Sequence, residues 1–253
     1  MQVTKISHLK YYPMLLMIIV TVQVLCFILV KLHITIFGIS TTTSGLLFPI
    51  DIYLFEIIGY CYGYEYSRQA VWLNSSSHCL FFVVLQLCNY LPYSSTMQSE
   101  YINAYHIIFK NSYWIIIGSF IGNFIGDYFS AYIVPKFKLI FNGNFTRSLI
   151  FITHIIAEFL TISISYTIMN LNSRMSLVEV FNLVLGTMLF KTILALLLLP
   201  FAKMLINFIK TSEGVEAYDF NQNYKLFKFS PDLNKVKFID CIGIYKHEKN
   251  MHN

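Results

Sequence analysis

Four ionisable residues lie well inside apolar runs of this sequence: Glu56, Asp127, Glu158 and Lys191. Such a side chain costs roughly 2.5 to 3.5 kcal/mol or more in the hydrocarbon of a bilayer, so it needs a partner or a purpose there. A carboxylate can accept two parallel N–H bonds from a planar, guanidine-like edge. Three acids against one lysine therefore predict a central polar cavity for a ligand that is rich in N–H donors or carries a cation.

The same residues also allow a structural interpretation, which the sequence leaves open. Lys191 can simply pair with one of the three acids and hold the helices together, as in a membrane scaffold. His154 lies four residues before Glu158, on the same helical face. We interpret His154 as a packed, hydrogen-bonded histidine in preference to a proton relay.

The run Tyr113–Lys136 is long enough to cross a bilayer and carries small and polar residues at helical spacing. Its two stripes, each with a residue every four positions, are Gly118, Gly122 and Gly126, and Ser119, Asn123 and Asp127. Small residues let a neighbouring helix approach closely, either in the same chain or in a second copy. The polar stripe offers hydrogen bonds to that neighbour or to a ligand, so we predict ligand contacts for Ser119, Asn123 and Asp127.

Several other kinds of chemistry have no matching pattern. The sequence contains no HExxH motif and no paired Cys or His residues at metal-ligand spacing, so we predict no metal and no cofactor. It also contains no G-x-S-x-G elbow and no Walker loop. An intramembrane enzyme remains an alternative only through generic neighbours such as His78 and Cys79. The basic residues form no single patch, which argues against a nucleic-acid partner.

The elements that position these side chains are membrane helices. Hydrophobic residues make up 56% of the chain, charged residues only 12%, and the mean hydropathy is +0.59, so the chain is an integral membrane protein of the all-α class. Six spans are predicted, over residues 13–30, 37–61, 70–91, 113–136, 149–169 and 177–208. They form a transmembrane domain over residues 1–210, followed by a short polar tail over residues 211–253.

Two prolines and the charge distribution refine this prediction. Pro49 interrupts the second span, which predicts either two half-helices or a loop that enters a helix, and Pro200 lies in the sixth. Lys and Arg residues collect on the side that holds both termini, at Lys5, Lys10, Arg68, Lys136, Lys138, Arg147, Lys203 and Lys210. Because short cytoplasmic loops are rich in Lys and Arg, both termini are predicted to be cytoplasmic.

The segment FPIDIYLFEIIGYCYGYEYSRQAVW, residues 48–72, resembles the signature of the queuosine precursor transporters, also called the vitamin uptake transporter family. Further likeness comes from Phe190-Lys191, Leu199-Pro200 and the tail segment EGVEAYDF. The matching positions are Phe48, Pro49, Glu56, Gly63, Arg68, Ser119, Gly126, Glu158 and Lys191. The likeness covers nearly the whole chain in order.

The resemblance implies a six-helix inner-membrane importer of 7-deazaguanines such as preQ0, preQ1 or queuine. Its helices would be arranged similarly to the substrate-binding subunits of energy-coupling-factor transporters. Glu158 or Glu56 would accept hydrogen bonds from the base, Asp127 or the remaining acid would face a cationic substituent, and Lys191 would contact the ring carbonyl or pair with an acid in the empty site.

The chain also departs from the family pattern. Many members carry a second acid where this chain has Tyr60, and a hydroxyl residue where it has Phe159. Ser130 stands where an Asp is frequent, one turn after Asp127. An alternative with the same fold is a binding subunit for another vitamin that works with an ATPase module. A homo-oligomer, packed through the glycine stripe, also remains open.

Overall fold

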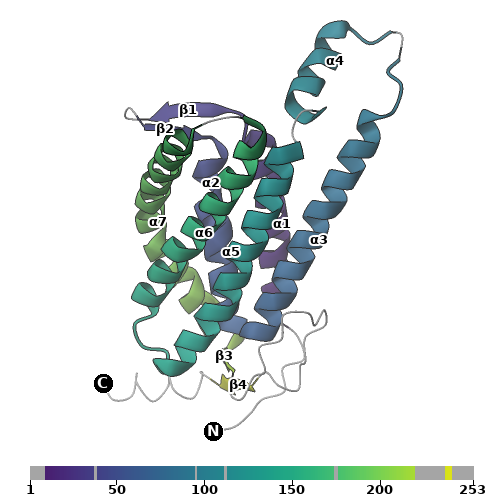
Figure 1. Ribbon diagram of the computed structural model, residues 1–253. Helices are drawn as coiled ribbons and strands as arrows, with labels where there is room; N and C mark the ends of the chain where they lie inside the picture. The colour runs from purple at the N-terminus through teal and green to yellow at the C-terminus, as the bar shows by residue number, and fades with distance from the viewer. Residues whose placement is uncertain are drawn as a thin grey trace.

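The computed structural model describes residues 9–36, 39–94, 96–110, 113–173, 176–219 and 237–240, and these form a bundle of long helices (Figure 1). The long helices are α1 (Tyr12–Leu29), α2 (Ser44–Tyr62), α3 (Tyr64–Asn89), α5 (Tyr113–Ile140), α6 (Thr146–Ser173) and α7 (Leu177–Glu213). A short helix α4 (Ser99–Tyr105) and a π-helical turn η1 (His106–Lys110) connect α3 to α5. Two antiparallel hairpins lie at opposite ends of the bundle: β1 (His33–Ile36) with β2 (Ile39–Thr42), and β3 (Val215–Tyr218) with β4 (Lys237–Asp240).

The predicted all-helical membrane fold is confirmed. Five helices of the described chain are long and apolar enough to cross a membrane, namely α1, α2, α3, α6 and α7. The sixth long helix, α5, has 28 residues and packs within the same bundle. Glycines together with Asn123 and Asp127 lower its hydropathy, so the prediction of a span over residues 113–136 rests on length and residue pattern and not on hydropathy alone.

The second predicted span differs from the structure at its beginning. The prediction started at residue 37, whereas strand β2 occupies Ile39–Thr42 and helix α2 starts only at Ser44. Pro49 lies inside α2, which continues to Tyr62, so two half-helices are not observed. A hairpin that enters one continuous helix is the arrangement found. Pro200 likewise lies inside a continuous helix, α7.

Helix α2 is the centre of the bundle. It contacts each of the other five long helices, and every residue from Asp51 to Tyr62 is buried. A helix surrounded on all sides has no face toward lipid, so polar residues at any position along it point into the protein. Asp51 and Glu56 are therefore both core residues, with fully buried side chains.

The glycine stripe of α5 serves packing inside this chain, because α6 lies directly against it. A Cβ atom on Gly118 would lie 2.8 Å from the carbonyl oxygen of Ser165, and one on Gly122 would lie 2.7 Å from that of Thr161. Gly126 faces the backbone of Ala157 in the same way. The close approach allows the Ser165 hydroxyl to donate to the Gly118 carbonyl at 3.0 Å.

A polar network closes the β3–β4 end of the bundle. The buried ammonium of Lys138 donates to the carbonyls of Tyr60 and Ala217 at 2.6 and 2.8 Å and pairs with Glu216 at 2.9 Å. Lys210 pairs with the other oxygen of Glu216 at 2.6 Å. Burial alone would raise the pKa of Glu216, but the two lysines outweigh burial and hold it below the usual value. Strand β3 is thereby fixed against α2, α5 and α7.

The turn between α2 and α3 requires glycine. Gly63 has φ +82°, and a Cβ there would lie 2.9 Å from both carboxylate oxygens of Asp219. Asp219 accepts a hydrogen bond from the Tyr64 amide at 2.8 Å, at the first turn of α3, where a negative charge is favourable. Within the first turns of α3, Arg68 pairs with Glu65, the second residue of the helix, at 2.6 Å. Gly63 and Arg68 thus form part of the β3–β4 end.

Replacing Asp219 by asparagine is expected to flatten the pH dependence of stability. Burial raises the pKa of Asp219 to about 6, although the Tyr64 amide acts against this shift. The native state then binds a proton more tightly than the unfolded chain, so the free energy of unfolding falls as the pH rises through this pKa. Between pH 5 and 7 the loss is roughly 1 kcal/mol, and asparagine, which keeps the acceptor, avoids it.

Thermal unfolding of the purified protein in detergent at pH 5, 6 and 7 measures this effect. The wild-type midpoint should fall by a few degrees more over this range than the Asp219→Asn midpoint. Glu100→Gln, which removes an exposed carboxyl group on α4, should behave like the wild type. Parallel profiles for wild type and Asp219→Asn would show that Asp219 does not exchange its proton in this range.

Candidate functional site

A buried ion pair joins α6 to α7 near the middle of the bundle. The Lys191 ammonium donates to Glu158 Oε2 at 2.9 Å, and the Lys191 and Glu158 side chains are 8% and 1% exposed. Lys191 also lies 3.9 Å from the centre of the Phe48 ring, in a cation–π contact with α2. The predicted residues Glu158, Lys191 and Phe48 are therefore direct neighbours, although more than 100 positions separate Phe48 from Glu158 in sequence.

His154 and Glu56 continue this cluster into the core. The Nε2 atom of His154 lies 4.0 Å from Glu158 Oε1, and its Nδ1 atom lies 3.5 Å from Glu56 Oε2. The His154 ring stacks on Tyr53 with a centroid distance of 4.1 Å, and the Tyr53 hydroxyl donates to the carbonyl of Ala195 at 2.8 Å. A row of four polar side chains thus runs from Lys191 through Glu158 and His154 to Glu56.

Asp51 is a fourth buried acid, and sequence reasoning missed its role. It was not among the predicted site residues, whereas its carboxylate lies within electrostatic range of Glu158, Lys191 and Asp127. Within the described residues, neither carboxylate oxygen of Asp51 has a hydrogen-bond partner. No local pattern singles out Asp51, because its place beside the other acids depends on α2 being surrounded by the other helices.

Asp127 occupies the neighbouring part of the core, on α5. Its carboxylate accepts one long hydrogen bond from Asn74 Nδ2 at 3.5 Å, and its Oδ1 atom has no partner in the described chain. Asn74 belongs to the polar stretch of α3, where Asn74, Ser75 and His78 are all buried. These three side chains therefore face protein, whereas Ser76 in the same stretch is exposed.

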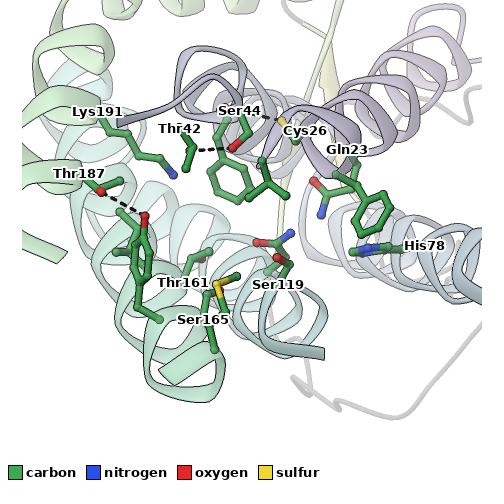
Figure 2. Close-up of a pocket in the computed structure, with 17 residues that line it drawn as sticks. Gln23, Cys26, Thr42, Ser44, His78, Ser119, Thr161, Ser165, Thr187 and Lys191 are labelled. Carbon is green, nitrogen blue, oxygen red and sulfur yellow. Dashed lines mark hydrogen bonds between the residues drawn. The ribbon is translucent and has the colours of Figure 1, made fainter. Parts of the chain in front are cut away.

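A cavity of about 80 Å³ lies between α1, α2, α3, α5, α6 and α7, in the half of the bundle nearer to β1 and β2 (Figure 2). One water molecule needs about 10 to 15 Å³ of such space, so the cavity accommodates several water-sized groups. Figure 2 shows Lys191 extending from α7 toward this space, with Gln23 and His78 on the opposite side. Aromatic rings of Phe27, Phe48 and Tyr166 form part of the wall.

The predicted site residues divide into three groups by their place relative to the cavity. Those that line it are Lys191, Ser119, Asn123 and Phe48. Those that lie behind it in the core are Glu56, Asp127 and Glu158, of which Glu158 touches the lining through Lys191. The motif residues Gly63 and Arg68 lie at the β3–β4 end and do not meet this group.

Gln23 and His78 line the cavity but were not predicted as ligand contacts. Gln23 on α1 is 4% exposed, and its Oε1 atom has no partner among the described residues. His78 on α3 lies at the cavity between the rings of Phe27 and Phe120. Gln23 gave a signal in the sequence, because it is a lone amide in an otherwise aliphatic run of 18 residues.

This arrangement suits a flat, polar ligand. The walls carry hydrogen-bonding side chains from Gln23, Asn123 and Thr161, of which Thr161 Oγ1 has no partner in the described part of the chain. The aromatic rings can stack on a planar molecule. Lys191 supplies a positive charge, and the acids behind it supply an excess of carboxylate. Within the described ranges, no group of three or more His, Cys, Asp or Glu side chains is arranged to hold a metal ion.

Comparison with known proteins identifies the family. Residues 42–205 match the family described as "Putative vitamin uptake transporter", which covers the cavity residues from Thr42 to Lys191 and more than half of the 253 residues. No curated protein and no solved structure matches the chain significantly. The matched region contains α2 to α6 and most of α7, including both partners of the buried ion pair. The chain is therefore a multi-pass membrane protein that belongs to the vitamin uptake transporter family, also called the queuosine precursor transporter family.

Proposed function

We propose that this protein imports 7-deazaguanine precursors of queuosine, such as preQ0, preQ1 or queuine, across the inner membrane. The observation that carries the proposal is the Lys191–Glu158 pair, whose lysine reaches a cavity lined by aromatic and amide side chains. A 7-deazaguanine is flat, presents an amine beside a ring N–H, and carries a ring carbonyl next to them. Each of these features has a counterpart among the side chains at the cavity.

Recognition would begin with an exchange of partners at the ion pair. In the empty site Glu158 binds the Lys191 ammonium at 2.9 Å. The ring N–H and exocyclic amine of the base would replace that ammonium on Glu158, because a carboxylate accepts two parallel N–H bonds. Lys191, released by a small movement, would donate to the ring carbonyl. Phe48 and Phe27 would stack on the base, and Asn123 and Ser119 would bond its remaining edge.

Asp127 and Glu56 have less direct parts in this proposal. Asp127 lies behind the cavity beside Asn74, where its charge would favour a precursor with an aminomethyl cation over one with a nitrile. Glu56 is one side chain further from the cavity, beyond His154. We therefore place Glu158 and Lys191 in direct contact with the substrate, while Asp127 and Glu56 act on it through their charge.

The two ends of the bundle support an alternating-access cycle. Placing both termini in the cytoplasm, as the basic residues favour, puts the cavity in the outer half of the membrane. The β3–β4 end, which faces the cytoplasm in that orientation, is closed by Lys138, Glu216 and Asp219. Import then requires this network to open while the β1–β2 end closes over the substrate.

Salvage of queuosine in living cells tests the cargo. Cells that cannot make queuosine are given the gene and a low concentration of preQ0, preQ1 or queuine, and queuosine is measured in their tRNA. We expect restoration that depends on the gene, and the order of the three precursors names the preferred substrate. No restoration by any precursor, in cells whose membranes contain the protein, would refute the proposed cargo. ATPase subunits that co-purify and are required for uptake would instead assign the chain to the binding-subunit class.

A further inference from the structure

His154 lies between two buried carboxylates, one side chain behind the cavity. Its Nδ1 atom is 3.5 Å from Glu56 Oε2, and its Nε2 atom is 4.0 Å from Glu158 Oε1. His154 and Glu56 are both fully buried. In the described part of the chain, neither ring nitrogen of His154 and neither carboxylate oxygen of Glu56 has a hydrogen-bond partner. Buried polar groups normally have partners, so this pair of facing groups is a candidate for sharing a proton.

A proton fits this pair better than another ligand does. The stacked ring of Tyr53 covers His154, and the fully buried Glu56 is not among the residues that line the cavity, so this pair leaves little room for a larger cation. No metal-binding group of His, Cys, Asp or Glu is found in the described residues. An imidazole and a carboxylate at this separation need only a small approach to share one proton in a hydrogen bond.

We infer that Glu56 and His154 form a binding site for one proton, which crosses the membrane together with the precursor. This inference rests on the proposed function and adds the coupling ion to it. The proton comes from water in the cavity and is released to water on the opposite side when the β3–β4 end opens. The cycle therefore moves one precursor and one proton in the same direction and changes no covalent bond of the precursor.

The coupling between proton and precursor follows from charge. A precursor needs Glu158 as an ionised carboxylate, because only that form accepts two N–H bonds. When Lys191 leaves Glu158 to contact the ring carbonyl, Glu158 loses its nearest positive charge. A proton on the His154–Glu56 pair supplies a replacement 4.0 Å away, at His154 Nε2, and removes the repulsion between Glu56 and Glu158. Proton binding then favours precursor binding, and linkage makes the effect reciprocal.

The other titratable groups near the pair act on this effect in opposite directions. They come from each of the helices packed around it: Asp51 and Tyr53 on α2, Asp127 on α5, Glu158 on α6, Lys191 on α7, Cys26 on α1, and His78 on α3 across the cavity. Three carboxyl groups, those of Asp51, Asp127 and Glu158, thus stand against one ammonium. Repulsion between Glu158 and Glu56 favours a proton on the pair, whereas the Lys191 ammonium opposes a proton on His154.

The affinity of the protein for preQ0 as a function of pH tests the inference. preQ0 carries a nitrile, so its substituent does not titrate in the range used. For wild-type protein in lipid nanodiscs, the Kd for preQ0 should rise between pH 5.5 and 8.5 by roughly 5- to 150-fold in total. In weakly buffered solution, binding of preQ0 should take up protons, at most one per molecule bound. The Glu56→Gln variant should lose both the slope and the proton uptake, and Glu100→Gln should keep both.

The outcomes separate the inference from the function on which it rests. preQ0 that binds with the same Kd at every pH and takes up no proton would overturn the inference and leave the proposed cargo intact. Wild-type pH dependence in Glu56→Gln would also overturn it, because the proton would then bind elsewhere. Should Glu56→Gln not fold, two measurements still test the inference: the pH dependence of the Kd in His154→Gln, and the proton uptake of the wild type on preQ0 binding. If none of the three precursors binds at any pH, the cargo itself is wrong and the inference falls with it.

Discussion

Replacing Lys191 by methionine is expected to lower precursor uptake by on the order of 100-fold or more. Truncating one partner of a buried, hydrogen-bonded charge pair costs about 2 to 5 kcal/mol, and each 1.4 kcal/mol corresponds to a factor of ten. In this protein the loss acts twice. The precursor carbonyl loses its donor, and Glu158 is left without the ammonium that binds it at 2.9 Å. Uptake of labelled precursor at matched protein levels in the membrane measures the effect.

A double variant separates the transport role of this pair from a structural one. Glu158→Gln combined with Lys191→Met removes both charges, so no unpaired ion remains in the core and much of the lost stability should return. Uptake should stay as low as in the single variants, because neither contact to the base is restored. A scaffold in which the pair only joins α6 to α7 also predicts that removing both charges restores stability. It differs in predicting that every flux stays unchanged. Glu100→Gln, an exposed acid on α4, serves as the matched control.

The sequence predicted the acid-lysine cluster because charges are conspicuous in apolar runs. Glu158 and Lys191 stand out for this reason, and their pairing was one of the two interpretations that the sequence left open. The arrangement around them could not be predicted, since it depends on which helix is central. Once α2 is surrounded by five helices, Asp51 joins the cluster, and His154 lies between Glu56 and Glu158.

The helices themselves were predictable from hydropathy, but their ends were not. Tertiary contacts determine the ends of two neighbouring helices. The β1–β2 hairpin takes the residues before Ser44, and Asp219 fixes the turn at Gly63, so that α3 begins at Tyr64 instead of at residue 70. Asp219 and Gly63 are 156 positions apart, and no local pattern connects them. The last helix also continues to Glu213, beyond the predicted domain boundary at residue 210.

Gly122→Ala is expected to destabilise the helix bundle. A Cβ at this position would lie 2.7 Å from the carbonyl oxygen of Thr161, which belongs to the backbone of α6 and cannot turn away. Helices α5 and α6 must then separate, at a cost of about 1 to 3 kcal/mol for one inserted methyl group. Because Asn123 and Ser119 sit on α5 beside this contact and line the cavity, the separation also displaces ligand contacts.

Gly186→Ala on α7 is the matched control, because a Cβ there meets no atom within 4 Å. Alanine favours a helix over glycine by about 1 kcal/mol, so this variant should be as stable as the wild type or more stable. The Gly122→Ala variant should unfold roughly 2 to 12 °C lower in detergent and show weaker precursor binding. Equal midpoints for Gly122→Ala and Gly186→Ala would mean that α5 and α6 are not in close contact through this stripe. The glycines would then be available to pack a second copy of the chain.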